Sequence, residues 1–140
     1  MQVYREDSQS VFPHLLAELS SNILQAVGFE DFKAEAAIVN YYPMSGNLSG
    51  HTDHSEDNLT APLLSISLGQ SAVFLLGGQT LKEIPNALLL RGGDVLIMTK
   101  EARLAYHGVP RILPTPTTWH GDEGEYLNSH RININIRQVH

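Results

Sequence analysis

The most regular stretch of the chain is Arg131-Ile-Asn-Ile-Asn-Ile-Arg137, in which polar and apolar residues alternate without a break. Side chains along a β-strand project to opposite faces in turn, so the isoleucines share one face and the arginines and asparagines share the other. The isoleucine face predicts packing on a core. The polar face is either the wet side of an edge strand or the wall of a cavity, where guanidinium groups can hold a dicarboxylic acid.

The chain after residue 28 consists of short runs rich in β-forming residues, separated by glycine, proline and asparagine. The runs cover residues 37–42, 63–68, 72–76, 87–90, 94–98, 104–108 and 131–139, with turns expected at 48–50, 69–70, 77–78 and 92–93. Short strands at this spacing favour an antiparallel sandwich or barrel, and the lack of helical segments between them argues against a parallel sheet. The predicted fold class is mainly β, with a jelly roll of two Greek-key sheets as the architecture.

One amphipathic helix is predicted ahead of the strands, over residues 12–27. Its apolar residues recur at steps of three and four, which places on one stripe Phe12, Leu15, Leu16, Leu19, Ile23, Leu24 and Val27. Pro13 suits the first turn, where no N–H is needed, and Gly28 suits the C-terminal stop. We expect this helix to pack outside a sheet, after a loosely held polar terminus over residues 1–10.

Composition limits the function classes that this chain can serve. Its 140 residues, 42% of them hydrophobic and 17% charged, fit a single domain over residues 1–140. The formal net charge of -6 opposes general binding to polyanions, so contact with nucleic acid needs a local patch. The absence of cysteine excludes disulfide scaffolds, thiolate zinc sites and cysteine nucleophiles. No membrane span or signal peptide is recognisable, so we expect a soluble, monomeric, intracellular protein.

A His-x-Asp pair, His51-Thr-Asp53, forms the first half of a candidate metal site. At strand spacing the two side chains project to the same face and can reach one ion. His107, at the end of the run over residues 104–108, is the natural third ligand. Two histidines and one carboxylate form a facial triad with open positions, which points to non-haem Fe(II). An isolated His-x-Asp pair is common by chance, and a loop histidine is more often a solvated residue.

Asn40 and Tyr42 form a further polar pair, because they lie two apart in the predicted strand over residues 37–42. Their amide and phenol are neutral hydrogen-bond donors, although strand tyrosines are usually packing residues. Residues 110–130, rich in proline, threonine, glycine and aspartate, are expected to form a surface loop. The His-x-Asp pair, the later histidine, this pair and the polar terminal strand form an ordered set that is more specific than any of its parts.

The order of these segments resembles that of the AlkB-type iron- and 2-oxoglutarate-dependent dioxygenases, and within them the AlkB homologue one group. The matching residues are His51-Thr-Asp53 and the ranges 28–42, 62–78, 93–98, 103–110 and 131–138. The resemblance implies a double-stranded β-helix in which Fe(II) is held by His51, Asp53 and His107. It also implies a 2-oxoglutarate site, with Arg131 on the distal carboxylate, whose residues are Arg131, Arg137, Asn40, Tyr42 and Asn133.

The implied reaction is oxidative demethylation of methylated bases in tRNA or DNA, which consumes dioxygen and 2-oxoglutarate and releases succinate, carbon dioxide and formaldehyde. AlkB-type proteins normally carry a nucleotide-recognition lid before the segment that starts at Gly28; residues 1–25 hold few aromatic or basic residues, so no lid is expected here. The alternative is a core that binds metal and 2-oxoglutarate without acting on nucleic acid, as a sensor or interaction module. A cupin-like metalloenzyme for a small molecule is a third reading, which the paired terminal arginines disfavour.

Overall fold

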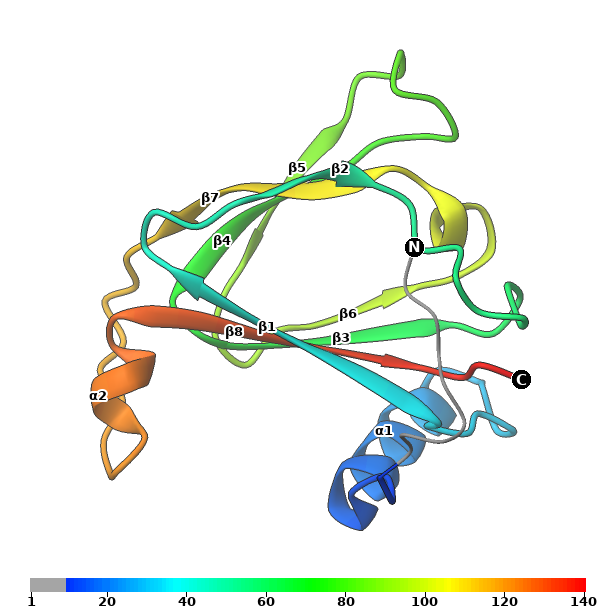
Figure 1. Ribbon diagram of the computed structural model, residues 1–140, viewed down its shortest axis with the longest axis horizontal. Coiled ribbons are helices and arrows are strands. Elements are labelled where there is room, and N and C mark those ends of the chain that lie inside the picture. Colours follow the sequence, from blue (N-terminus) through cyan, green and yellow to red (C-terminus); the bar gives the residue numbers. More distant parts are fainter. Residues whose placement is uncertain (1–9) are drawn as a thin grey trace.

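The computed structural model describes residues 10–140, which form two four-stranded antiparallel sheets and two α-helices (Figure 1). The first sheet contains, in spatial order, β1 (Ala36–Pro43), β8 (His130–Arg137), β3 (Leu63–Gly69) and β6 (Val95–Met98). The second contains β2 (Leu48–His51), β7 (His107–Leu113), β4 (Ser71–Leu76) and β5 (Asn86–Leu90). Two facing sheets of this kind form a jelly roll, so the predicted fold class is confirmed. The terminus predicted over residues 1–10 lies, except for Ser10, outside the described residues.

Strand β8 lies in the middle of the first sheet, paired with β1 on one side and with β3 on the other. Ile134, for example, stands opposite Val39 of β1 and Ile66 of β3. The two faces of β8 differ as predicted, because Ile136 joins an apolar cluster with the N-terminal helix while Arg131 lines a cavity on the other face. The polar face is therefore a cavity wall, and the edge-strand alternative is wrong.

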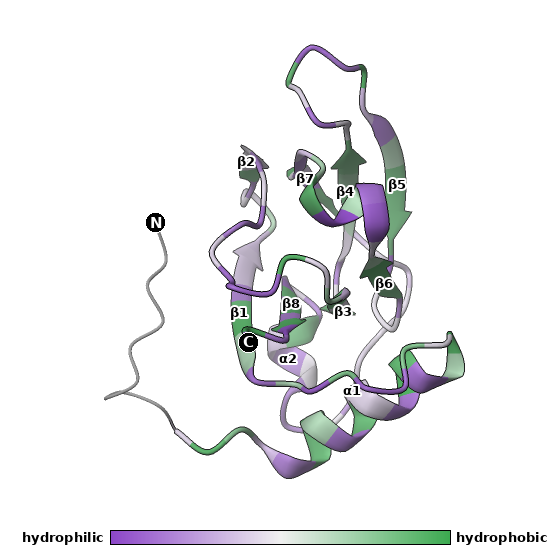
Figure 2. Cartoon of the chain, turned by 90° about the vertical axis from the view of Figure 1, so that its right-hand side faces the viewer, coloured by the Kyte–Doolittle hydropathy of each residue, from purple (hydrophilic) through white to green (hydrophobic). Residues whose placement is uncertain are grey.

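Two apolar clusters hold the elements together. One lies between the sheets and includes Leu63, Phe74 and Met98. The other joins Leu24 of α1 (His14–Ala26) to Leu64 and Ile136 on the outer face of the first sheet. Figure 1 shows α1 beside this sheet, and Figure 2 shows apolar colour along β4, β5 and β6. The helix thus packs outside a sheet, as predicted.

Helix α1 begins and ends close to the predicted residues. Pro13 caps its N-terminus, and Gly28 follows its C-terminus with φ of 95°, a backbone conformation that suits glycine. The Gly28 N–H donates to the Gln25 carbonyl over 3.0 Å, and the Phe29 N–H donates to the Leu24 carbonyl over 2.9 Å. These two bonds form a Schellman motif, which satisfies carbonyls at the helix end. No helix within residues 10–140 is both long and apolar enough to cross a membrane.

Only part of the predicted stripe contacts the sheet: Phe12, Leu16, Ile23 and Leu24 belong to the apolar cluster there, whereas Leu15, Leu19 and Val27 do not. Leu15 is 80% exposed and Leu19 is 48% exposed, and Val27, just past the helix, is 55% exposed. Ser20, which the predicted stripe leaves out, is fully buried, and its hydroxyl donates to the Leu16 carbonyl one turn earlier. A small side chain at this point lets the helix lie close to the sheet. Apolar spacing alone does not reveal this preference, because it counts serine as polar.

The strand predicted over residues 104–108 is wrong in its first half. Residues Lys100–Leu104 form a 3₁₀ helix, η2, and β7 starts only at His107. Lys100 has φ of 52°, in the left-handed region, and this turns the chain away from β6. A short apolar run does not distinguish a strand from a helical turn by periodicity alone. The result is that Arg103, on η2, is buried.

The surface loop predicted over residues 110–130 is also partly wrong, because β7 continues to Leu113 and α2 (Gly124–Leu127) lies within it. Pro110 is exposed and follows the last residue of β7 that pairs with β2, so its missing N–H is tolerated. The turn predicted over residues 48–50 belongs instead to β2. No residue of this strand is buried, so backbone pairing with β7 forms it rather than an apolar face.

The burial of α1 leads to a prediction about stability. Leu24→Ala should lower the free energy of unfolding by about 3 kcal/mol, because it opens a cavity between the helix and the sheet. Leu19→Ala, on the same helix, should cost less than about 1 kcal/mol, because its side chain is half-exposed. Urea unfolding of both variants measures the difference. Equal losses would contradict the packing described here.

Candidate metal centre

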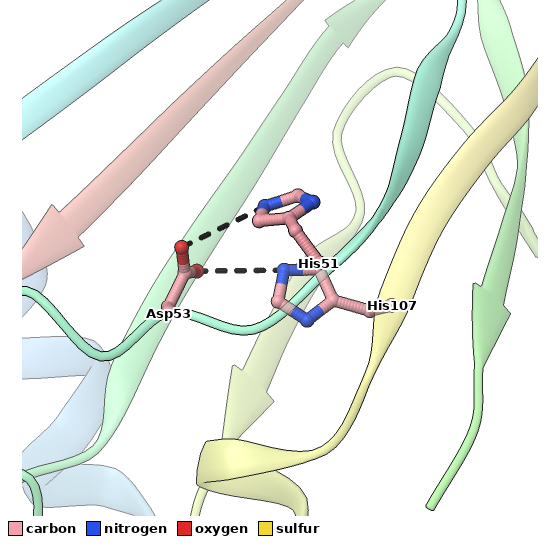
Figure 3. A group of neighbouring side chains, drawn as sticks. All are labelled: His51, Asp53 and His107. Carbon is pink, nitrogen blue, oxygen red and sulfur yellow. Dashed lines mark ion pairs between the residues drawn. The ribbon is translucent and has the colours of Figure 1, made fainter. Parts of the chain in front are cut away.

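Three potential metal ligands meet at one end of the second sheet (Figure 3). His51 is the last residue of β2 and His107 is the first residue of β7, and the two face each other in the strand pairing. The His51 Nε2 lies 3.7 Å from Asp53 Oδ1, and the His107 Nε2 lies 3.4 Å from Asp53 Oδ2. One ligand atom from each residue lies within 4.8 Å of the others. The predicted triad is thus brought together.

The local geometry differs from the one expected for His51 and Asp53. Strand β2 ends at His51, so Asp53 stands in the following loop and not at strand spacing on the same strand. His107 likewise begins its strand, whereas it was expected near the end of one. The two imidazoles come together because β2 and β7 are paired, which places their ring centroids 4.4 Å apart.

The orientation of both imidazoles suits metal binding. The Nδ1 atom of His51 lies 2.9 Å from the Ser49 carbonyl, and that of His107 lies 3.0 Å from the Ala105 carbonyl. A carbonyl only accepts hydrogen bonds, so each Nδ1 donates, and the other ring nitrogen, Nε2, faces Asp53. Two imidazole Nε2 atoms and a carboxylate directed at one point are a ligand set that can hold a metal ion in place of protons.

Asp53 is buried, with 7% of its surface exposed, and is kept ionised by its neighbours. Arg137 NH2 donates to Asp53 Oδ1 over 2.8 Å, and Asn135 Nδ2 donates to Oδ2 over 3.5 Å. Burial alone would raise the pKa of Asp53. The hydrogen bond from His107, together with the charges of Arg137 and the two imidazoles, outweighs burial and lowers this pKa well below its usual range.

Two further buried charges next to this centre were not assigned a role at the site from the sequence. Glu56 is 4% exposed, and it pairs with Arg103 NH2 over 3.0 Å and also with Arg137 NH1. Arg103 is 2% exposed. The one signal for Glu56 is its position three residues after Asp53. Burial of both side chains depends on the path of η2, which the sequence does not reveal.

A cavity of about 340 Å³ adjoins the three ligands and lies between the two sheets. Its lining includes all five residues that the resemblance implies for 2-oxoglutarate: Asn40, Tyr42, Arg131, Asn133 and Arg137. The volume is within the range of small-molecule sites. The structure therefore brings these residues to the same cavity as His51, Asp53 and His107.

Arg131 has hydrogen-bond donors without a protein acceptor. It is 1% exposed, and its NH2 donates to Ser67 Oγ over 2.9 Å. Its Nε and NH1 are buried and have no acceptor among residues 10–140. Burial lowers the pKa of Arg131, with Tyr42 and Asp94 acting against this, yet a guanidinium stays charged in proteins. Burial also raises the pKa of Tyr42, which keeps the phenol neutral. A buried cation with unmet donors fits a bound carboxylate.

Arg137 differs in its contacts from the other four residues that the resemblance implies for 2-oxoglutarate. Its guanidinium contacts Asp53 and Glu56, so it lies on the side of the metal ligands. Asn133 is engaged with β3 through Ser65 Oγ, to which its Nδ2 donates over 2.6 Å. The cavity thus has a metal side, next to Arg137, and a distal side, next to Arg131.

The lowered pKa of Asp53 predicts how its contribution to stability changes with pH. A carboxylate whose pKa is lowered in the folded state stabilises the protein fully at pH values above its pKa in the unfolded chain, which is about 3.9. This stabilisation is lost as the pH falls below that value toward the pKa of the folded state. In metal-free protein, the difference in unfolding free energy between wild type and Asp53→Asn should narrow by on the order of 2 kcal/mol from about pH 6 to about pH 2.5.

Urea unfolding at a series of pH values measures this difference. Asp57→Asn is the matched control, because the Asp57 side chain is 87% exposed and its removal should leave the pH dependence unchanged. A wild-type advantage over Asp53→Asn that stays constant through this range would contradict the assigned charge state.

Comparison with known proteins identifies the family of the chain. The 2OG-Fe(II) oxygenase superfamily matches residues 2–137 of the chain. The human protein named nucleic acid dioxygenase ALKBH1 is 49% identical over 124 residues, which are 89% of this chain and 30% of that protein. The protein named tRNA demethylase abh1 of Schizosaccharomyces pombe is 40% identical, over 97% of this chain and 47% of that protein. The chain thus spans less than half the length of either relative.

A solved structure shares the fold. The structure of OsALKBH1 superposes with a TM-score of 0.75 at 26% sequence identity, covering 91% of this chain and 66% of that chain. The match includes most of the described elements, and both sequence relatives cover the segments that hold the candidate ligands. The chain therefore belongs to the 2OG-Fe(II) oxygenase superfamily, within its AlkB-type group.

Proposed function

We propose that this chain is the catalytic core of an Fe(II)- and 2-oxoglutarate-dependent dioxygenase that demethylates bases of tRNA or DNA. The observation that carries the proposal is the convergence of His51, Asp53 and His107 on one point, in the same cavity as the unmet donors of Arg131. Fe(II), 2-oxoglutarate and dioxygen are the general requirements of the superfamily. The choice of nucleic acid as substrate rests on the names of both sequence relatives, and the choice of demethylation on the name of the Schizosaccharomyces pombe protein.

The two histidines and Asp53 would hold Fe(II) on one side of its coordination sphere. A triad of this kind leaves three of the six octahedral positions for other ligands. The bound iron would supply chelation of the 2-oxo acid and activation of dioxygen. The residues of this chain fix the ligand geometry, since Ser49 and Ala105 orient the imidazoles and Arg137 orients the carboxylate.

The distal side of the cavity would hold the far carboxylate of 2-oxoglutarate. Arg131 has unmet donors at Nε and at NH1, and a carboxylate can accept a charge-assisted hydrogen bond from either of them. Tyr42 and Asn40 line the same cavity and offer neutral donors. A dicarboxylic acid placed in this way has its oxo-acid end toward the metal ligands and its other end on Arg131.

The substrate would be a methyl group on a nucleic-acid base. In the overall reaction one oxygen atom enters the methyl C–H bond and the other enters succinate, formed from 2-oxoglutarate with release of carbon dioxide. The hydroxymethyl group then leaves as formaldehyde and the base regains its proton. Exposed His54 and half-buried Ser55 line the cavity next to Asp53, so we propose that the base enters on this side, out of its stack.

Formaldehyde release tests the proposed reaction. Protein loaded with Fe(II) and 2-oxoglutarate should release formaldehyde from methylated oligonucleotides and lose this activity when a chelator removes the metal. Unmethylated oligonucleotides of the same sequence are the control. If 2-oxoglutarate is converted to succinate but no methylated tRNA or DNA oligonucleotide yields formaldehyde, the demethylase proposal is wrong and a core without action on nucleic acid is the better description.

The two ends of the cavity should respond separately to mutation. Asp53→Ala should abolish Mn(II) binding, because it removes the anionic ligand of the triad. Arg131→Gln should weaken binding of 2-oxoglutarate by about 30-fold or more, since a buried charge pair is worth about 2 kcal/mol or more, while leaving Mn(II) affinity within about threefold.

Anaerobic calorimetry with Mn(II), and then with 2-oxoglutarate, measures both affinities. Arg111→Gln, which changes an exposed arginine of β7, is the matched control and should alter neither. Unchanged 2-oxoglutarate affinity in Arg131→Gln would refute the role proposed for this residue.

A further inference from the structure

The loop that carries Asp53 has no regular structure between His51 and Leu63, yet it is tied down at both ends by one side chain. Arg103 NH1 donates to the Asp53 carbonyl over 2.8 Å, and Arg103 Nε donates to the Ala61 carbonyl over 3.0 Å. Its NH2 donates to Glu56, between those two residues, over 3.0 Å. Each nitrogen of the guanidinium therefore holds a different oxygen of the segment 53–61.

Glu56 extends this contact to β8, a central strand of the first sheet. It contacts Arg103 on one side and Arg137 of β8 on the other, and Arg137 also pairs with Asp53. The four buried side chains carry two negative and two positive charges, so their formal sum is zero. The ion pairs thus link Arg103 on η2 to Glu56 in the loop, Glu56 to Arg137 on β8, and Arg137 to the candidate metal ligand Asp53.

The segment 100–107 carries both Arg103 and the candidate ligand His107. η2 ends at Leu104, and His107 begins β7 three residues later. The segment starts at Lys100, whose φ of 52° lies in the left-handed region that costs energy for a residue other than glycine. Arg103 therefore links the loop of Asp53 to the segment that positions His107.

We propose that Arg103 and Glu56 are positioning residues that hold Asp53 in its ligand geometry before any metal binds. This inference rests on the metal site proposed above and adds two residues that act through Asp53 without touching the ion. Asp53 needs such support because, unlike the two histidines, it lies outside the strands. An unsupported loop of this length would leave its carboxylate free to turn away from the imidazoles.

Stability alone does not account for this arrangement. A buried ion pair often contributes no more to stability than a pair of apolar residues of similar volume, because both charges lose their hydration. A planar guanidinium can instead serve three separate acceptors at once, two of them main-chain carbonyls at the ends of one loop. Lysine has a single nitrogen and cannot reproduce this pattern.

The test uses the whole chain and two variants. Arg103→Lys keeps the charge but loses the three-point contact. The double variant Arg103→Met/Glu56→Gln removes one positive and one negative charge, so Asp53 and Arg137 remain a neutral pair and no charge is stranded. Arg111→Lys and Arg111→Met are the matched controls on an exposed arginine.

The first measurement is hydrogen exchange in the metal-free protein. The N–H groups of Asn58 and Ala61 are hydrogen-bonded, at 2.9 Å to the Val139 carbonyl and 2.9 Å to Asn58 Oδ1, so both report on loop order. In both variants these amides should exchange about tenfold faster or more, while the amides of β3 and β8 keep their protection. Wild-type exchange in the loop, or equal loss of protection in β3 and β8, would overturn the proposal.

The second measurement is Mn(II) affinity by calorimetry. Both variants should bind Mn(II) about 10- to 100-fold more weakly than wild type, with the controls unchanged. Wild-type affinity in the double variant would overturn the proposal even if the loop exchanges faster. If wild type itself fails to bind Mn(II), the metal site proposed above is wrong. In that case faster loop exchange in the variants alone still supports the role of Arg103 and Glu56 in ordering the loop. Loop exchange that is unchanged in the variants overturns that role as well.

Discussion

The alternation of side chains along β8 is the constraint on which the rest of the molecule depends. The strand is paired on both sides, so its backbone polar groups are satisfied and its side chains alternate between the outer face of the sheet and the inner face. Ile134 and Ile136 on one face join the cluster under the helix. Arg131 and Arg137 are buried on the other face, which is stable only where acceptors or a ligand meet their donors. A slip of one residue would exchange the two faces.

The balance of buried charge explains why the cavity suits a metal and a diacid together. The positive and negative side chains around Asp53 sum to zero, whereas Arg131 has no ion-pair partner among residues 10–140. A divalent cation alone would add two positive charges to this region, and a dicarboxylate alone would add two negative charges. The two bound together leave the sum unchanged, and Arg131 then gains an anionic partner.

Much of this arrangement was predictable, for reasons that lie in particular residues. β8 and α1 were recognised because the period of their apolar residues, two in the strand and three to four in the helix, is kept over a long segment and predicts the element. The triad was recognised as a set of residue types in order, although His51 and Asp53 are related by a loop and not by strand spacing. β2 was missed because an exposed strand of serine and glycine has no apolar pattern, and η2 because its turn depends on Lys100. Glu56 and Arg103 were missed as parts of the site because their burial depends on the path of η2.

The most direct test of this account is a crystal structure of the protein with Mn(II) and 2-oxoglutarate, grown without dioxygen. It should show one metal ion coordinated by Nε2 of His51, Nε2 of His107 and the carboxylate of Asp53. The diacid should chelate that ion through its oxo-acid end and accept a hydrogen bond from Nε or NH1 of Arg131 at its far end. A metal bound elsewhere, or a diacid whose far carboxylate leaves Arg131 without a partner, would contradict the account.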